Sequence, residues 1–207
     1  LMNKVNGKLA FSGDRIIIDV ANTDIMGIPI DNVHGLIENL SGSKPSILSV
    51  ATNVVHSDFQ KGFALVHASP LEKTVGKMFK KAQLYGDITL KLGLTVPLAQ
   101  AENTTVSGDI GFDDASIKLP AWRLEATKLH GGLHFTENTT QAKNITGLIF
   151  GKPFQLQLTT IDADKVHSTT RATITNHLAI ADLETWLKMP LSKVVNGSTD
   201  VVVDLDF

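Results

Sequence analysis

The chain has 207 residues, of which 43% are hydrophobic, so it can bury the core of one sizeable domain or of two small ones. It contains 19 Lys and Arg, 21 Asp and Glu, no Cys, one Tyr and two Trp. This composition excludes disulfides and thiolate metal sites, and it argues against nucleic-acid binding, which needs basic and aromatic residues together. No apolar run reaches ~18 residues, so no transmembrane helix is predicted.

Most of the chain alternates between apolar and polar residues, the pattern of a β-strand with one buried face. The clearest example is "GDITLKLGLTVPL" from Gly86 to Leu98, about twice as long as the usual strand of ~5–6 residues. Short connections rich in turn-forming residues separate the segments, which predicts an antiparallel meander. The expected strands are 5–11, 14–20, 33–38, 47–56, 86–98, 105–112, 116–126, 128–135, 141–150, 153–161, 165–175 and 198–207.

A first helix is predicted before the long strand 86–98. Ser69 and Glu72 can form a capping box around Pro70, and an apolar stripe follows from Leu71 to Ala82. The opposite face would carry Lys73, Lys77, Lys80 and Lys81. These lysines have two interpretations: a solvated helix face, or contact with the anionic head groups of lipids at the mouth of a groove.

A second, shorter helix is predicted near the C-terminus. Asp182 can cap it, and Pro190 lies just beyond its end. Its apolar side would consist of Leu183, Trp186 and Leu187. Only two short helices are therefore available to cover the apolar faces of many strands.

A short motif, consisting of an apolar residue, any residue and then Gly, recurs along the chain. Examples are "VNGKLAF" from Val5, "VSGDIGF" from Val106 and "ITGLIF" from Ile145. The spacing is irregular, so no solenoid of fixed period is predicted. A Gly near the start of a strand permits a bulge or a bend, and we expect these glycines to curve the sheet.

The sequence contains no established catalytic or metal-binding motif. His130 and His134 are four residues apart, but in a strand this separation is ~13 Å, too far for both to bind one metal ion. Asp162 and Asp164 resemble the start of a calcium loop, but His167 stands where that loop needs Gly. We therefore predict no enzyme activity, no metal and no cofactor. A Ser-His-Asp triad that converges only in space would leave no mark on the sequence, so a hydrolase remains an alternative.

Three stretches carry a resemblance to a known family. They are "SPLEKTVGKMFKKAQLYGDITLKLGLTVPL" from Ser69, "VSGDIGFDDASIKLPAWRLEATKLHGGLHF" from Val106 and "ITGLIFGKPFQLQLTT" from Ile145. In this order they resemble the central β-rich region of the large AsmA-like proteins of Gram-negative bacteria, of the YhdP type. The similarity covers roughly residues 31–206, so we expect residues 1–207 to be one β-rich segment excised from a larger protein.

The resemblance implies a periplasmic protein whose full-length chain is anchored in the inner membrane by one N-terminal helix. Members of the family are implicated in the transport of phospholipids to the outer membrane and in outer-membrane integrity. The implied partners are phospholipid acyl chains, the rest of the parent chain and, through the parent protein, the membranes. The family has no known catalytic motif, so none can be transferred to this chain.

Pattern and resemblance together predict a mainly β fold: a long, curved antiparallel sheet that forms a half-open groove, with two short accessory helices. Neighbouring strands would merge their apolar faces into one lipid-binding wall. The residues expected to face acyl chains are Leu90, Leu92, Leu94, Val96, Ile110, Phe112, Leu133 and Phe135. The alternative is a structural or interaction module of the periplasm with a closed β core and no ligand.

Overall fold

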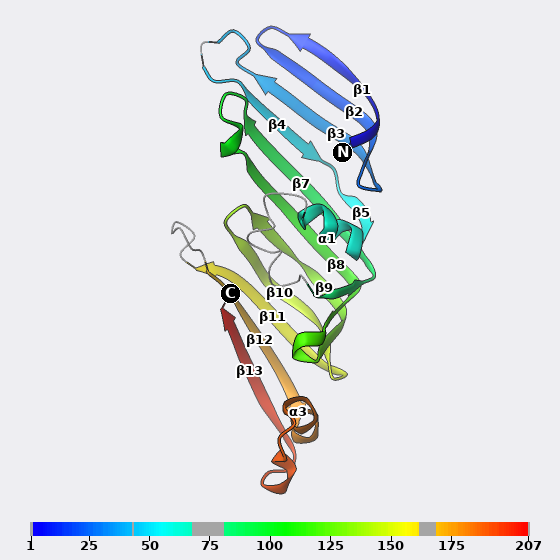
Figure 1. Cartoon of the computed structure of the whole chain (residues 1–207), viewed down its shortest axis with the longest axis vertical. Coiled ribbons are helices and arrows are strands. Elements are labelled where there is room, and N and C mark those ends of the chain that lie inside the picture. The colour runs from blue at the N-terminus through cyan, green and yellow to red at the C-terminus, as the bar shows by residue number, and fades with distance from the viewer. Residues whose placement is uncertain (1, 43, 68–80, 162–168, 207) are drawn as a thin grey trace.

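The computed structural model describes residues 2–42, 44–67, 81–161 and 169–206. Its strands form one antiparallel sheet of 13 strands, arranged as the predicted meander. The edges are β1 and β13, so the sheet is open, and two short strands, β5 and β6, pair with β7 and β8 beside the main path. Figure 1 shows the strands stacked along the long axis of the molecule, from β1 at one end to β13 at the other.

The first part of the sheet is built from long hairpins and two short strands. Its strands are β1 (Met2–Ser12), β2 (Arg15–Ile25), β3 (Ile28–Glu38), β4 (Ile47–Thr52), β5 (Val55–Asp58), β6 (Gln83–Tyr85) and β7 (Asp87–Pro97). The predicted strand 47–56 is thus two strands, both of which pair with β7.

The second part of the sheet continues the meander to the other edge. Its strands are β8 (Thr105–Leu119), β9 (Leu124–Thr136), β10 (Thr140–Ile149), β11 (Lys152–Ile161), β12 (Thr169–Ala179) and β13 (Ser198–Asp206). Short 3-10 turns lie between some of them: η2 (Ala101–Asn103), η3 (Pro120–Trp122) and η4 (Leu191–Lys193).

Two predicted boundaries near β8 are wrong. The strand runs through Asp113 and Asp114 without ending, because the chain forms a β-bulge there: Asp114 has a φ of +60° and the register with β9 shifts. The hairpin turn comes later, at η3, where Pro120 has no N–H to donate and Arg123 has a φ of +50°. The predicted strand 116–126 is therefore the end of β8, this turn and the start of β9.

The helix α1 (Phe59–His67) was missed by the sequence analysis. Asp58 is placed at its N-cap, since the Oδ1 of Asp58 accepts a hydrogen bond from the backbone N–H of Lys61 at 3.2 Å. Phe59 and Phe63 are four residues apart on its apolar side, a signal that the sequence did contain. The helix predicted from Leu71 lies outside the described residues, except for its last two positions, which are not helical.

The helix α3 (Ile180–Leu187) confirms the second predicted helix, but it begins earlier than expected. Asp182 lies in its first turn, and the N-cap is Ala179, which makes no side-chain cap hydrogen bond. A carboxylate in the first turn still interacts favourably with the helix dipole. Among the described residues, no helix is long and apolar enough to span a membrane.

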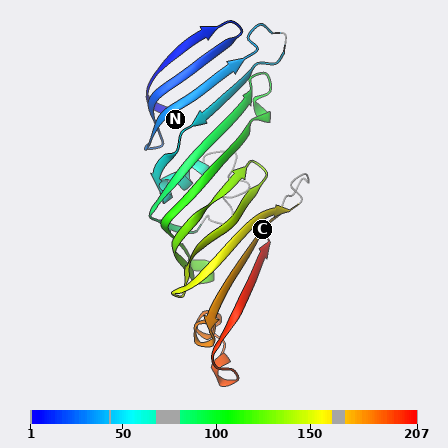
Figure 2. The same ribbon diagram turned by 180° about the vertical axis from the view of Figure 1, so that it is seen from behind.

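The apolar side chains gather on one face of the sheet. A hydrophobic cluster follows this face from Val20 on β2 to Phe154 on β11, and a second cluster of Leu178, Ile180 and Leu183 forms at the start of α3. The helix α1 lies in front of the sheet in Figure 1 and behind it in Figure 2, so it covers one face only.

Two of the repeated glycines make room for aromatic rings on this face. Gly108 pairs with Phe135, and Gly147 pairs with Phe154, at directly opposed positions of neighbouring strands. A Cβ atom at either glycine would lie 2.5 or 2.8 Å from the facing ring. Each ring therefore covers the glycine opposite it, an arrangement that compensates for the missing side chain.

Candidate functional site

The apolar face of the sheet is the strongest candidate for a binding surface. Direct cross-strand pairing joins its residues into rows: Leu90 pairs with Ile110, which pairs with Leu133. In the next row, Leu92 pairs with Gly108, which pairs with Phe135. The other predicted acyl-chain residues, Leu94, Val96 and Phe112, lie on the same face by alternation along β7 and β8. All of the predicted residues therefore share one continuous surface.

Burial divides these residues into two groups. Four are buried, with 9% or less of their surface exposed: Leu90, Ile110, Phe112 and Phe135. The other four are half-buried: Leu92, Leu94, Val96 and Leu133.

The helix α1 accounts for burial in the middle of the face. The ring centroids of Phe59 and Phe112 are 5.5 Å apart. Gly62 lies so close to the sheet that a Cβ there would be 2.7 Å from Ile88 Cδ1 and 3.0 Å from Leu90 Cδ1. This part of the predicted lipid path is therefore covered by the chain's own helix and belongs to the protein core.

One row of the face becomes more exposed toward β1. A row of paired residues runs from Leu9 on β1 through Ile18, Gly35 and Val50 to Leu94 on β7. Leu9 is 64% exposed and Phe11, on the same strand, is 75% exposed. The described helices pack elsewhere, α1 against β5, β6 and β7, and α3 against β12. This row is thus half-buried to exposed at most of its positions, whereas Ile28, Ile30 and Val33 on β3, in the same hydrophobic cluster, are buried.

A cavity at the other end of the face was missed by the sequence analysis. It has a volume of about 490 Å³ and lies between α3, the η3 turn and strands β10, β12 and β13. The ring of Trp186 packs against Phe150 with centroids 6.1 Å apart, and its Nε1 donates a hydrogen bond to the backbone oxygen of Trp122 at 2.8 Å. The apolar stripe of α3 was visible in the sequence, but its approach to η3 depends on contacts between distant residues.

The predicted head-group contacts stay a prediction. Lys73, Lys77 and Lys80 lie outside the described residues. Lys81 is exposed in a turn just before β6.

The opposite, polar face of the sheet carries cross-strand pairs of His and Asp. The Nδ1 and Oδ1 atoms of each pair are 2.7 to 3.3 Å apart. The two members of each pair occupy directly opposed positions on neighbouring strands, which brings their side chains together. The pairs are His34 with Asp19, His134 with Asp109, His130 with Asp113, and His177 with Asp200. In the described part of the chain, no three potential metal ligands cluster.

A serine extends the last of these pairs. The Nδ1 of His177 is 2.7 Å from Asp200 Oδ1, and its Nε2 is 2.8 Å from Ser198 Oγ. This is the connectivity of a Ser-His-Asp triad. It also follows directly from strand alternation, because Ser198 and Asp200 are two residues apart on β13. The Asp200 side chain is 89% exposed, whereas the Asp of a working triad is buried, so we interpret this arrangement as a surface hydrogen-bond chain.

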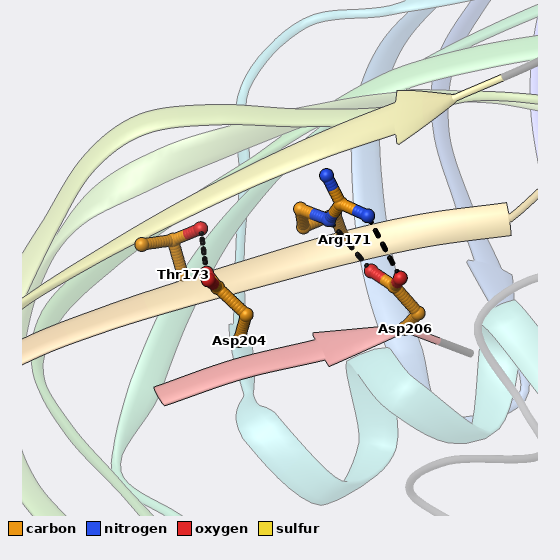
Figure 3. A network of polar contacts seen from close by, with 4 residues as sticks. All are labelled: Arg171, Thr173, Asp204 and Asp206. Carbon is orange, nitrogen blue, oxygen red and sulfur yellow. Dashed lines mark hydrogen bonds and ion pairs between the residues drawn. The ribbon is translucent and has the colours of Figure 1, made fainter. Parts of the chain in front are cut away.

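Further polar contacts join β12 to the edge strand β13, as Figure 3 shows. The Nε and Nη2 atoms of Arg171 donate to the two carboxylate oxygens of Asp206 at 2.8 and 2.9 Å. The hydroxyl of Thr173 donates to Asp204 at 2.6 Å. The hydrogen bonds between Arg171 and Asp206 lower the pKa of the Asp206 carboxyl and raise the pKa of Arg171. These contacts hold the edge strand on the sheet.

Comparisons with known proteins bear on the family of the chain. The family model described as YhdP protein matches residues 2–207 and so includes every described strand. A search of curated proteins and a search of solved structures each found no match. The resemblance noted in the sequence is thereby confirmed, and the chain belongs to the YhdP protein family.

Proposed function

We propose that the chain is a lipid-binding segment of a bridge-like phospholipid transport protein that joins the inner and outer membranes. The observation that carries this proposal is the continuous apolar face of an open sheet. Apolar surface in water is unfavourable by ~25 cal/mol per Å², so such a face needs a covering partner. Acyl chains suit it, because they are long and apolar and need no directional polar contacts.

In this proposal, acyl chains lie on the apolar face while head groups stay in water at its margin. Lipids move by sliding along the face, so no bond is made or broken and neither a cofactor nor a nucleic acid takes part. Membership of an AsmA-like family supports this function. The parent protein would lie in the periplasm, anchored in the inner membrane, and would support the integrity of the outer membrane.

Burial refines the path that we propose for the lipid. Leu92, Leu94 and Val96 are half-buried and border the open part of the face toward β1. Leu90 and Phe112 lie under α1 and are less suited to contact a ligand. The lipid path therefore follows the β1 side of the face, past α1 rather than beneath it.

A second candidate function is a structural or interaction module without a ligand. The observation that favours it is the burial of Leu90, Ile110, Phe112 and Phe135, which reach the exposure of an ordinary core. In this alternative, other protein segments cover the rest of the apolar face.

A photo-crosslinking residue can distinguish the two candidates. Placed at Leu94 in bacterial cells, it should capture phospholipid, because this residue is half-buried and belongs to the row that leads to the exposed Leu9. Placed at Thr95, which is exposed on the opposite face, it should capture little lipid. Placed at Leu90, it should crosslink to protein. If Leu94 captures only protein, and mass spectrometry finds no lipid in the purified chain, the ligand-free module is correct.

A further inference from the structure

The cavity beside α3 has the size of a ligand site. Its volume of about 490 Å³ falls within the range of ~300–1,000 Å³ that is typical of small-molecule pockets. Its wall is mostly apolar and includes Trp122, Phe150, Ile174, Leu178, Trp186 and Val203. Two other lining residues, Asn176 and Arg123, bring polar chemistry to this wall.

Asn176 is a buried amide without a hydrogen-bond partner. It lies on β12 between Ile174 and Leu178 of the same face, and it pairs in register with Phe154 on one side and Val201 on the other. Only 9% of its surface is exposed, and within the described residues neither Oδ1 nor Nδ2 has a partner. A buried amide is unfavourable unless its hydrogen bonds are made, so this position calls for a polar group inside the cavity.

Arg123 is the charged residue of the cavity lining. It lies in the turn between η3 and β9, and its side chain is exposed. Within the described part of the chain, its guanidinium makes no ion pair. A guanidinium offers several N–H donors in a fixed plane, which suits the oxygens of a carboxylate or a phosphate.

We propose that this cavity binds one acyl chain whose carbonyl oxygen accepts a hydrogen bond from Asn176 Nδ2 and whose negatively charged group lies at Arg123. The apolar wall takes the hydrocarbon, and Asn176 Oδ1 accepts a hydrogen bond from a hydroxyl group or a water on the ligand side. A phospholipid supplies these two groups as an ester carbonyl and a phosphate, and a free fatty acid supplies them as the two oxygens of its carboxylate. The site deepens the proposed function, because it gives a sliding lipid one position where it is held by polar contacts.

The chain contains its own probe of this cavity. Its two tryptophans, Trp122 and Trp186, both line the cavity, so tryptophan fluorescence reports on this site. Bromine on an acyl chain quenches tryptophan at short range. We would titrate the purified chain with 9,10-dibromostearic acid in one arm and with phosphatidylglycerol carrying a dibrominated chain in the other. Saturable quenching is expected, and the arm with the lower Kd identifies the source of the acyl chain.

The substitution Asn176→Leu tests the polar contact. It keeps an apolar wall but removes the amide, so the Kd should rise about tenfold through the loss of one hydrogen bond. The same change should raise the urea midpoint of unfolding, because a buried amide without a partner is removed. Arg123→Gln should weaken binding of both probes, most strongly at low salt. The matched control Thr175→Leu, on the opposite face of β12, should leave the Kd unchanged.

The outcomes separate this site from the proposed function. If Asn176→Leu raises the urea midpoint but binds the probes as tightly as the wild type, the amide makes no hydrogen bond to the ligand and the site is overturned. If neither probe gives saturable quenching while Leu94 still captures phospholipid, the site is overturned and the transport function stands. If both experiments fail, both proposals are overturned.

Discussion

Phe59, the first residue of α1, packs its ring against Phe112 of β8, with the centroids 5.5 Å apart and the planes inclined by 56°. Phe112 is predicted from the sequence to face lipid, whereas in the structure its ring faces α1. The ring of Phe112 therefore belongs to the protein core.

Phe59→Ala should destabilise the fold. Phe59 is 4% exposed, and removal of a buried ring of this kind costs about 3–5 kcal/mol of unfolding free energy. Urea denaturation followed by circular dichroism measures the change. Gln60→Ala, at an exposed position of the same helix, is the matched control and should change stability little. Equal midpoints for the two variants would show that α1 does not pack on the sheet.

A charge introduced on the apolar face should affect folding differently at Leu90 and at Leu94, two positions on β7. Leu90→Asp should unfold the chain, because an ionised carboxylate cannot be buried under α1 without a partner. Leu94→Asp should leave the fold intact, since an open face can hydrate the charge, while phospholipid crosslinking from a probe at Val96 is lost. Circular dichroism and crosslinking yields check the two parts. Unfolding of both variants would indicate a closed core throughout.

Gly108→Ala should destabilise the sheet by about 1–3 kcal/mol through overpacking. The new Cβ would lie 2.5 Å from Phe135 Cζ and 2.7 Å from the backbone oxygen of Lys91. Adding Phe135→Leu should recover part of the lost stability, because it removes the ring that the new Cβ would meet. The close contact with the backbone oxygen of Lys91 would remain. Gly93→Ala is the control, since its Cβ would meet the hydroxyl of Ser107 at 3.1 Å on the polar face. Thermal unfolding measures all of these variants, and a Gly108→Ala variant as stable as Gly93→Ala would contradict the packing argument.

The ion pair between Arg171 and Asp206 should stabilise β13 in a pH-dependent way. Its hydrogen bonds lower the pKa of Asp206 below the ordinary value of 3.8, so the folded state gains stability above that pH and loses it as the pH falls further. The pair is exposed, so the effect is small and is screened by salt. At low salt, Asp206→Asn should unfold at a lower temperature than the wild type at pH 7, and the difference should shrink as the pH falls below 3.8. A difference that stays constant as the pH falls below 3.8 would exclude this ion pair as its source.

Ser198→Ala should not change the rate that the chain gives in a hydrolase assay. His177 and Asp200 are exposed beside Ser198, so water competes for their hydrogen bonds and a nucleophile is not activated. With p-nitrophenyl butyrate as substrate, we expect both the wild type and the variant to match the buffer rate. A rate that depends on Ser198 would instead support the hydrolase alternative.

The alternation of apolar and polar residues is enough to predict the fold class and the composition of the apolar face. Alternation along a strand is a local property, so residues such as Leu92 and Leu94 could be assigned to one face without knowledge of their neighbours. The meander could also be predicted, because short connections leave antiparallel pairing as the available arrangement. Boundaries near Asp114 were wrong, because a β-bulge and a turn contain the same kinds of residue.

Contacts between distant segments set which parts of that face are covered and which polar groups meet. The burial of Leu90 depends on α1, and the cavity beside Trp186 depends on the approach of α3 to η3. The partnering of His177 with Asp200 requires the register of two strands, and the isolation of Asn176 requires the positions of all its neighbours. Local periodicity tells which way a side chain points, whereas its environment is set by segments far away in the sequence.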